Sequence, residues 1–225
     1  MTGFPFAIVG FDLDGTFLDT SADLTAAVNH SLDQAGRSPL TIADVKPMIG
    51  GGAKAMLAHG MNATGGCDAD ELHRLYKELL RYYEANIANA TRPFPGALDA
   101  LDALDALEVR SAIVTNKFES LAIKLLGELG LLDRFVTVIG GDTLGPGRAK
   151  PAADPIVEMI AQCGGGRAAF VGDSIFDIEA ARNAGIPSIA CRFGFLMQPV
   201  EELGADAIID GYHELLPALR AIGAP

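Results

Sequence analysis

Short apolar runs alternate with longer amphipathic segments along most of the chain. The first run, Phe6–Phe11, is partly β-branched and ends at an acidic loop, as a buried strand does. Comparable runs occur at Ser111–Val114, Val136–Ile139, Ala168–Val171, Ser188–Cys191 and Ala207–Ile209. Buried strands that alternate with helices are typical of a parallel sheet covered on both sides. The pattern therefore predicts an α/β protein with a Rossmann-like parallel sheet.

One region, residues 19–90, departs from this alternation and shows only helical periodicity. Its apolar stripes are Leu24, Val28, Leu32 and Ala35, and then Leu72, Leu75, Leu79, Tyr83 and Ile87. Thr41–Asp44 fits a capping box that opens another helix, and the breaker cluster Arg92–Gly96 marks the return of the chain. We predict an all-helical domain at residues 19–90, inserted into an α/β core formed by residues 1–18 and 91–225.

Composition narrows the classes of partner. The chain has 225 residues and a formal net charge of −12 at pH 7, and its 49% hydrophobic content excludes a disordered or fibrous protein. A charge this negative argues against nucleic acid and anionic membrane surfaces as partners. An anionic substrate would need local attraction from a lysine, backbone amides or a bound cation.

The cysteines and the N-terminal residues indicate where in the cell the protein is expected. Cys67, Cys163 and Cys191 are far apart and form no CxxC pair, which disfavours a disulfide framework or a zinc site. Met1–Gly10 has no basic lead, Asp12 interrupts its apolar run, and no stretch approaches the ~18 apolar residues that span a bilayer. We expect a cytoplasmic protein with no membrane partner. Monomer and homodimer both remain open.

Polar residues follow the predicted strands at the edge where open parallel sheets place ligand sites. They are Asp12 and Asp14, Thr115 and Asn116, Lys150, and Asp173 with Asp177. Two carboxylates two residues apart repel each other unless a cation or a shared proton holds them. With Asp173 they make a hard oxygen cluster that suits Mg²⁺.

The same residue types suit phosphoryl chemistry. A lysine, a threonine hydroxyl and the backbone amides of Leu13, Asp14 and Asn116 make a cradle for a dianionic phosphoryl group. A carboxylate beside the phosphorus can attack it and form an aspartyl-phosphate. The second carboxylate can protonate the leaving alcohol and then deprotonate the attacking water. The set predicts Mg²⁺-dependent phosphoryl transfer with water as the final acceptor.

The order of these motifs resembles the haloacid dehalogenase superfamily, whose signature is DxDGT, then Thr or Ser, then Lys, then Gly-Asp with a further Asp. Several stretches are similar to its phosphoglycolate phosphatase group: Phe11–Ser21, Ile49–Ala53, Thr91–Gly96, Val114–Lys117, Gly140–Thr143 and Val171–Asp177. The resemblance covers nearly the whole chain. It implies a Mg²⁺-dependent phosphatase of a small phosphorylated metabolite, with 2-phosphoglycolate the best single candidate.

The resemblance also implies roles for individual residues. Asp12 would be the nucleophile and a Mg²⁺ ligand, and Asp14 the acid/base, touching Mg²⁺ through its backbone carbonyl. Asp173 would ligate Mg²⁺, with Asp177 as its neighbour.

The phosphoryl group would be bound by Thr115, Lys150 and the amide of Asn116. The helical insert corresponds to a cap that closes over the site, and Gly50–Ala53 would be its loop facing the chemistry.

Each of these residues also has a purely structural interpretation. The DxDGT segment could be a solvated turn after a strand, because Asp, Gly and Thr all favour turns. Thr115 with Asn116 could be a helix N-cap, and Asp177 a first-turn acid that stabilises the helix dipole. The presence of all the motifs in order favours the functional interpretation.

Other functions remain open on this pattern. A sugar-phosphate mutase, a pyrophosphatase or a phosphonate hydrolase could use the same core, the last with Lys46 or Lys54 as a Schiff base. A catalytically silent binding protein is a further alternative, although Asp12, Asp14 and Lys150 are all present. Arg92, Arg192 and the Gly50–Ala53 loop are candidates for binding a substrate carboxylate.

Overall fold

The central element of the fold is a six-stranded parallel sheet. The structure is a computed structural model that describes residues 3–224. The strands lie in the order β5-β4-β1-β6-β7-β8, and every pair is parallel. Their bounds are β1 Ile8–Phe11, β4 Arg110–Val114, β5 Val138–Ile139, β6 Ala168–Gly172, β7 Ser188–Cys191 and β8 Ala207–Ile209. When only these six strands are numbered in chain order, their order across the sheet is 3-2-1-4-5-6, which is typical of doubly wound α/β folds. The predicted fold class is confirmed.

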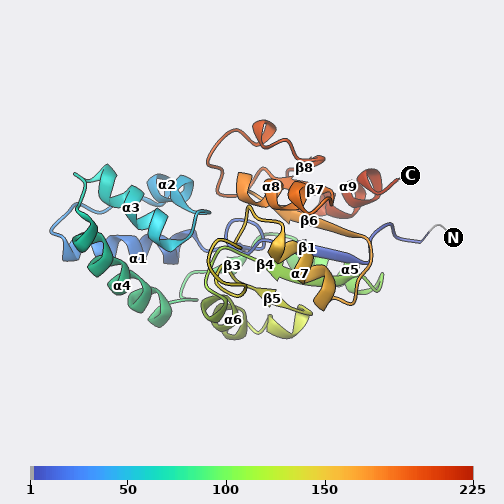
Figure 1. Cartoon of the computed structure of the whole chain (residues 1–225), viewed down its shortest axis with the longest axis horizontal. Helices are drawn as coiled ribbons and strands as arrows, with labels where there is room; N and C mark the ends of the chain where they lie inside the picture. Colours follow the sequence, from blue (N-terminus) through green and yellow to red (C-terminus); the bar gives the residue numbers. More distant parts are fainter. Residues whose placement is uncertain (1–2, 225) are drawn as a thin grey trace.

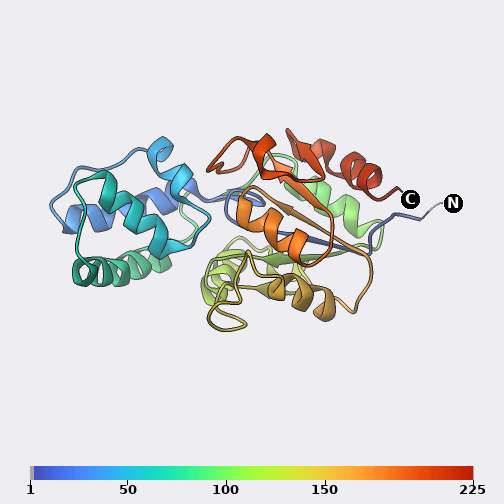
Figure 2. The ribbon, with the colours of Figure 1, turned by 45° about the horizontal axis from the view of Figure 1, so that its top comes forward.

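Helices cover both faces of the sheet (Figures 1 and 2). They are α5 Ala97–Asp105, α6 Glu119–Glu128, α7 Asp154–Gln162, α8 Ile175–Asn183 and α9 Leu215–Ile222. Short 3₁₀ turns lie at Lys46–Met48, Leu132–Arg134, Val200–Leu203 and Tyr212–Glu214. Within residues 3–224, no helix is long and apolar enough to cross a membrane.

Alternation along each central strand builds a separate core on each face. In β1, Ile8 packs with the α7 and α8 side, whereas Val9 and Phe11 pack with α5, α6 and α9. In β6, Phe170 and Val171 divide in the same way. Successive side chains of a strand point to opposite faces, so a strand buried on both sides must be apolar throughout. This explains the uninterrupted apolar runs in the sequence.

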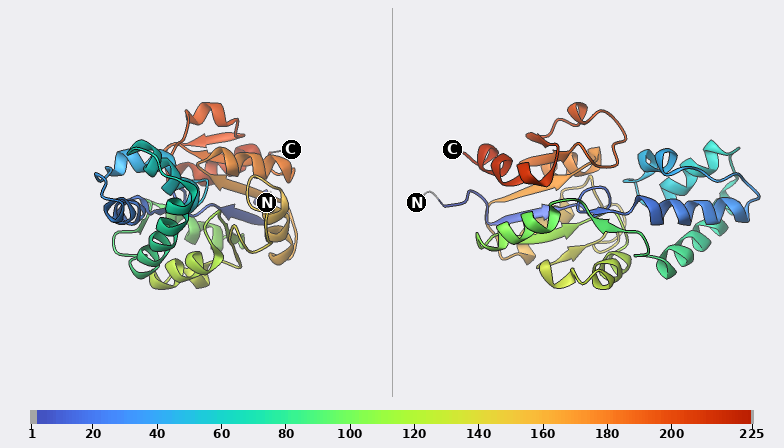
Figure 3. Two further views of the ribbon diagram at one scale, coloured as in Figure 1. Left: turned by 60° about the vertical axis from the view of Figure 1, so that its left-hand side comes forward. Right: turned by 180° about the vertical axis from the view of Figure 1, so that it is seen from behind.

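The segment between Asp19 and Arg92 contains four α-helices that lie beyond one end of the sheet (Figures 1 and 3). They are α1 Ser21–Gln34, α2 Ile42–Val45, α3 Ala53–Ala63 and α4 Ala69–Ala85. Both α1 and α3 pack against α4. The capping box at Thr41 and Asp44 is present. The core of this group includes Leu24, Val28, Leu32, Leu75, Leu79 and Tyr83, all buried.

Two short connections join these helices to the sheet. β2 (Leu18–Asp19) and β3 (Arg92–Pro93) pair antiparallel where the chain leaves the core and returns to it. No pattern in the sequence predicted this two-stranded ribbon. The carboxylate of Asp23 ties the connections further, because it accepts hydrogen bonds from Ala90 N (3.0 Å), Thr91 N (2.9 Å) and Thr91 Oγ1 (2.7 Å).

Candidate active site

Two acidic residues lie at the point where the strand order reverses. Asp12 follows β1 and Asp173 follows β6, and these strands are neighbours at the centre of the sheet. The backbone N–H of Asp12 donates to Val171 O at 2.9 Å, which continues the β1–β6 ladder into the loop. Crevices at the carboxyl ends of strands at such a switch point are the usual ligand sites of open α/β sheets.

A buried lysine joins the two sides of this crevice. Lys150 Nζ donates to Asp12 Oδ1 (2.8 Å), to Asp177 Oδ1 (2.5 Å) and to Val114 O (2.8 Å). Its side chain is 2% exposed. An ammonium has three N–H donors, so the charge of Lys150 is fully committed within the site.

The Asp177 carboxylate is also saturated. It lies in the first turn of α8 and forms a capping box with Ser174. Its Oδ2 accepts from Ser174 N (2.9 Å), Ser174 Oγ (2.6 Å) and Asp173 N (3.3 Å), while Oδ1 faces Lys150. A carboxylate offers about four lone-pair sites. Asp177 is therefore engaged both as a helix cap and as a partner of Lys150.

Asp173 keeps lone pairs free. Its Oδ1 accepts from Thr16 Oγ1 at 3.1 Å and its Oδ2 from Phe195 N at 2.5 Å, one donor for each oxygen. Gly15 leaves room for this carboxylate: it has φ +86°, and a Cβ built there would lie 2.2 Å from Asp173 Oδ2. A side chain at position 15 would thus strain the backbone and displace Asp173.

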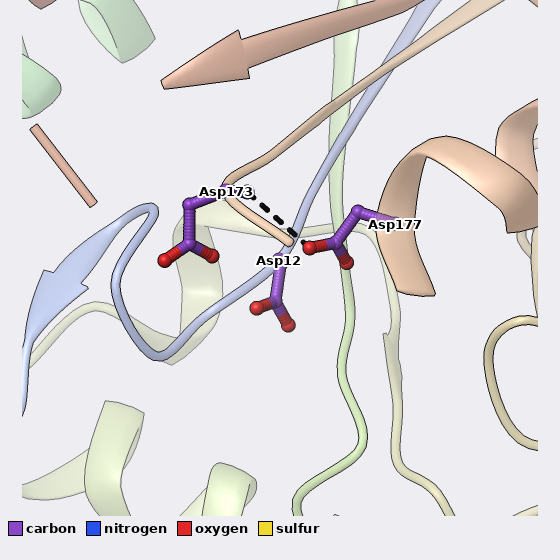
Figure 4. A group of neighbouring side chains, drawn as sticks. All are labelled: Asp12, Asp173 and Asp177. Atoms are coloured by element: carbon purple, nitrogen blue, oxygen red, sulfur yellow. Dashed lines mark hydrogen bonds between the residues drawn. The ribbon is translucent and has the colours of Figure 1, made fainter. Parts of the chain in front are cut away.

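Negative charge accumulates where these residues meet. Asp12, Asp173 and Asp177 are buried and bring one carboxylate oxygen each within 4.8 Å of one another (Figure 4). Burial raises the pKa of Asp12 to about 6 against the opposing effect of Lys150. Burial, with Asp177 and Asp12 nearby, raises the pKa of Asp173 well above its usual value. The excess charge and the free lone pairs on Asp12 and Asp173 fit a hard divalent cation with oxygen ligands.

Asp14, the second acidic residue of the DxDGT segment, forms an ion pair with a different lysine, Lys117. Lys117 Nζ contacts Asp14 Oδ1 at 2.8 Å and Oδ2 at 2.6 Å. Burial opposes the charge on Lys117, but the nearby Asp14 carboxylate prevails and raises the pKa of the ammonium above its usual value. Lys117 was given no role from the sequence. Its signals there were its place two residues after Thr115, at the carboxyl end of a strand, and its membership of the family-like stretch Val114–Lys117.

A cavity of about 160 Å³ opens between the sheet edge and the helical group. Asp12, Asp14, Thr115, Asn116 and Lys117 line it from the sheet, together with Phe118 and Leu121. The helical side contributes Leu24, Ile49, Gly50, Gly51, Gly52, Ala53, Lys54, Met56, Tyr76, Leu79, Leu80 and Tyr83. An engineered cavity of about 150 Å³ holds benzene, so this space suits a small ligand. The predicted loop at Gly50–Ala53 therefore does face the acidic residues.

The threonine and asparagine after β4 brace the loops around the cavity. Thr115 Oγ1 accepts from Lys117 N at 3.2 Å. The N-cap of α6 is Phe118, so Thr115 and Asn116 are not the helix N-cap of the structural interpretation. Asn116 Nδ2 donates to Gly50 O and Lys150 O, both at 3.2 Å. The side chain of Asn116 thereby links the helical insert to the sheet loops. Its Oδ1 is buried without a partner among the described residues.

Arg92 and Arg192 do not fulfil the expectation that they read a substrate. Arg192 pairs with Glu201 and Asp210 at the surface, and Arg92 donates to the carbonyl of Thr91. Both are exposed, and neither lines the cavity. Arg192 has its charge satisfied by two acidic side chains, and neither arginine reaches the cavity, so the structure gives this expectation no support.

Fold and site together define a doubly wound α/β enzyme with a carboxylate–lysine centre at the switch point. The sequence model of the haloacid dehalogenase-like hydrolases matches residues 9–191. The chain belongs to this family.

Similar proteins share both sequence and architecture over nearly the full length. A phosphoglycolate phosphatase of Agrobacterium fabrum (strain C58) is 42% identical over 219 residues, which cover 96% of this chain and 92% of that protein. One from Caulobacter vibrioides is 40% identical over 209 residues, covering 92% and 87%. The crystal structure of a predicted phosphoglycolate phosphatase from Haemophilus somnus 129PT superposes with a TM-score of 0.87 at 27% identity, covering 95% and 97%.

Proposed function

We propose that this protein is a Mg²⁺-dependent phosphatase that hydrolyses 2-phosphoglycolate to glycolate and phosphate. One observation carries the proposal: Asp12, held by Lys150 beside Asp173, opens with Asp14 onto one small cavity. The names and near-complete coverage of the relatives support this substrate.

The residues that would hold Mg²⁺ are Asp12 and Asp173 through their carboxylates and Asp14 through its backbone carbonyl. Bound there, Mg²⁺ would offset the charge of the phosphoryl group and of the carboxylates around it. Asp177 has its oxygens committed to Lys150 and to the first turn of α8, so its role would be to orient Lys150 and Ser174.

The chemistry then divides into two displacements at phosphorus. Asp12 attacks, the bond to the ester oxygen breaks, and Asp14 gives its proton to the leaving alkoxide. Asp14 next takes a proton from water, whose oxygen attacks the aspartyl-phosphate and releases inorganic phosphate and the Asp12 carboxylate. Thr115 and the amide of Asn116 would hold the phosphoryl oxygens through both steps. Lys150 would join them by turning towards the phosphoryl group the N–H that it gives to Asp12 in the free protein.

Helices α1–α4 would act as a cap over this reaction, with residues 19–90 as the cap domain and the remainder as the core. Support comes from the cavity, which has walls from both groups, and from the hydrogen bond of Asn116 to Gly50 O. Such a closure excludes water and surrounds the substrate.

Phosphate release from a panel of esters tests the proposal. The panel contains 2-phosphoglycolate, sugar phosphates, nucleoside monophosphates and pyrophosphate, each with Mg²⁺ and with EDTA. We expect a Mg²⁺-dependent preference for 2-phosphoglycolate, lost by at least about 10³-fold in Asp12→Asn. Near-normal turnover by Asp12→Asn would remove Asp12 as the nucleophile, and silence on every compound would reject the phosphatase.

A further inference from the structure

Lys117 occupies an unusual position for a lysine. Its side chain is 5% exposed, it grips both oxygens of Asp14, and its Nζ lies 4.8 Å from the centre of the Tyr83 ring. Lys117 comes from the loop after β4 and Tyr83 from α4 of the helical group. Both line the cavity, so the two groups face each other across the boundary between core and helices.

Tyr83 and Lys117 both have hydrogen-bond donors that no residue of the described structure accepts. Among the described residues the Tyr83 hydroxyl has no hydrogen-bond partner, although the residue is only 2% exposed. Of the three N–H donors of the Lys117 ammonium, two are directed at Asp14. A buried, unpartnered hydroxyl loses its hydration with nothing in return, unless a ligand supplies an acceptor.

The other cations near the cavity are poorly suited to a second anionic group. Lys150 spends all three donors on Asp12, Asp177 and Val114 O. Lys54 lines the cavity but is exposed to solvent. Lys117 is therefore the buried cation of the described lining, and Tyr83 supplies a neutral donor beside it.

We propose that Lys117 and Tyr83 form a subsite for the substrate carboxylate, which takes the place of Asp14 as the partner of Lys117. The inference rests on the proposed phosphatase function and assigns its selectivity to these two residues. One carboxylate oxygen accepts from the Lys117 ammonium and the other from the Tyr83 hydroxyl. The substrate class is a short phosphate monoester with a carboxylate beside the ester carbon, because the cavity of about 160 Å³ holds both ends of the molecule.

Two consequences follow for the enzyme. Binding of the carboxylate releases Asp14 from Lys117, so the acid/base is freed only when a substrate of the right class is present. It also joins α4 to the loop after β4, so the same contact draws the helical group onto the core.

The test compares 2-phosphoglycolate with 2-hydroxyethyl phosphate, in which a neutral alcohol replaces the carboxylate. We expect the wild type to prefer phosphoglycolate by at least about 100-fold in kcat/KM. Lys117→Met should reduce this preference to below about tenfold, and Tyr83→Phe should lower it by about tenfold while leaving the Lys117–Asp14 pair intact. Lys124→Met, on the exposed face of α6, is the matched charge control and should leave the ratio unchanged.

Three outcomes would overturn the subsite. An equal loss on both substrates in Lys117→Met, with no change of ratio in Tyr83→Phe, would mean that Lys117 only positions Asp14. Collapse of the ratio in Lys54→Met instead would assign the anion to Lys54. A Lys117-dependent preference for pyrophosphate over phosphoglycolate would make the second anion a phosphate.

Binding measurements test the carboxylate subsite independently of the proposed phosphatase activity. Calorimetry in an Asp12→Asn background measures the affinities for phosphoglycolate and 2-hydroxyethyl phosphate without turnover. Tighter binding of phosphoglycolate that depends on Lys117 supports the subsite even if no ester is hydrolysed. Equal binding of the two compounds rejects it, even if Mg²⁺-dependent hydrolysis is observed.

Discussion

Lys150 Nζ lies 2.8 Å from Asp12 Oδ1 and 2.5 Å from Asp177 Oδ1. One buried ammonium therefore bridges a carboxylate from the loop after β1 and one from the first turn of α8. Its removal would leave both carboxylates buried beside Asp173 without a cation. We expect Lys150→Met to destabilise the metal-free protein by about 3–5 kcal/mol, the usual cost of breaking a buried ion pair. Urea unfolding in EDTA measures this. Lys124→Met, which breaks a surface pair with Glu128, should cost less than about 0.5 kcal/mol.

The charge on Asp12 should itself oppose folding when no metal is bound. Burial raises its pKa from 3.8 to about 6, so between these values the folded state binds more protons than the unfolded state. The contribution of Asp12 to stability is therefore present below pH 4 and is lost as the pH rises towards 6.

A comparison of the wild type with Asp12→Asn isolates this effect from the other carboxylates. In EDTA, the free energy of unfolding of Asp12→Asn minus that of the wild type should grow between pH 4 and pH 6 and then level off. Urea unfolding at half-unit pH steps gives the curve. A difference that shrinks over this range would mean that Lys150 outweighs burial and lowers the pKa of Asp12.

Asp173 offers a test of the proposed Mg²⁺ site that does not alter Asp12, the proposed nucleophile. Its carboxylate keeps lone pairs beyond the donors Thr16 and Phe195 N, and Asn replaces one of its oxygens by an NH₂ group. We expect Asp173→Asn to raise the Mg²⁺ concentration for half-maximal phosphate release at least about tenfold. Asp210→Asn, which removes an exposed partner of Arg192, should leave that concentration unchanged. Equal Mg²⁺ requirements in both variants would place the cation elsewhere.

The strands could be predicted from the sequence because burial on both faces alone determines their residue pattern. Ser188–Cys191 and Ala207–Ile209 coincide with β7 and β8, because a strand covered on both faces must be apolar throughout. The clustering of the candidate site residues could be predicted in the same way, since the carboxyl ends of parallel strands converge on one edge. Asp12, Asp14, Asp173 and their neighbours needed no side-chain geometry to be brought together.

The remaining features depend on contacts that no local pattern records. Lys117 becomes a site residue only because Asp14, 103 positions earlier, lies beside it. β2 and β3 have two residues each and pair across the whole helical insert, too short for any periodicity. Arg192 was considered as a ligand for a substrate carboxylate because the sequence does not show that Glu201 and Asp210 pair with it.

The last prediction concerns the junction between the helical group and the core. Asp23, in the first turn of α1, accepts from Ala90 N, Thr91 N and Thr91 Oγ1, and Asp23 and Thr91 are buried. Asp23→Ala would leave these donors without an acceptor in a place that water reaches poorly. We expect a loss of about 2–4 kcal/mol in stability, together with faster amide hydrogen exchange at Ala90 and Thr91.

Exchange at these two amides distinguishes a junction from a simple helix cap. Asp33→Ala, at an exposed position of the same helix, is the control and should change neither stability nor exchange appreciably. If Asp23→Ala accelerated exchange throughout α1 but left Ala90 and Thr91 protected, the carboxylate would act within its own helix. Selective exposure of the returning segment would instead show that the single side chain of Asp23 holds the two connections between the helical group and the core together.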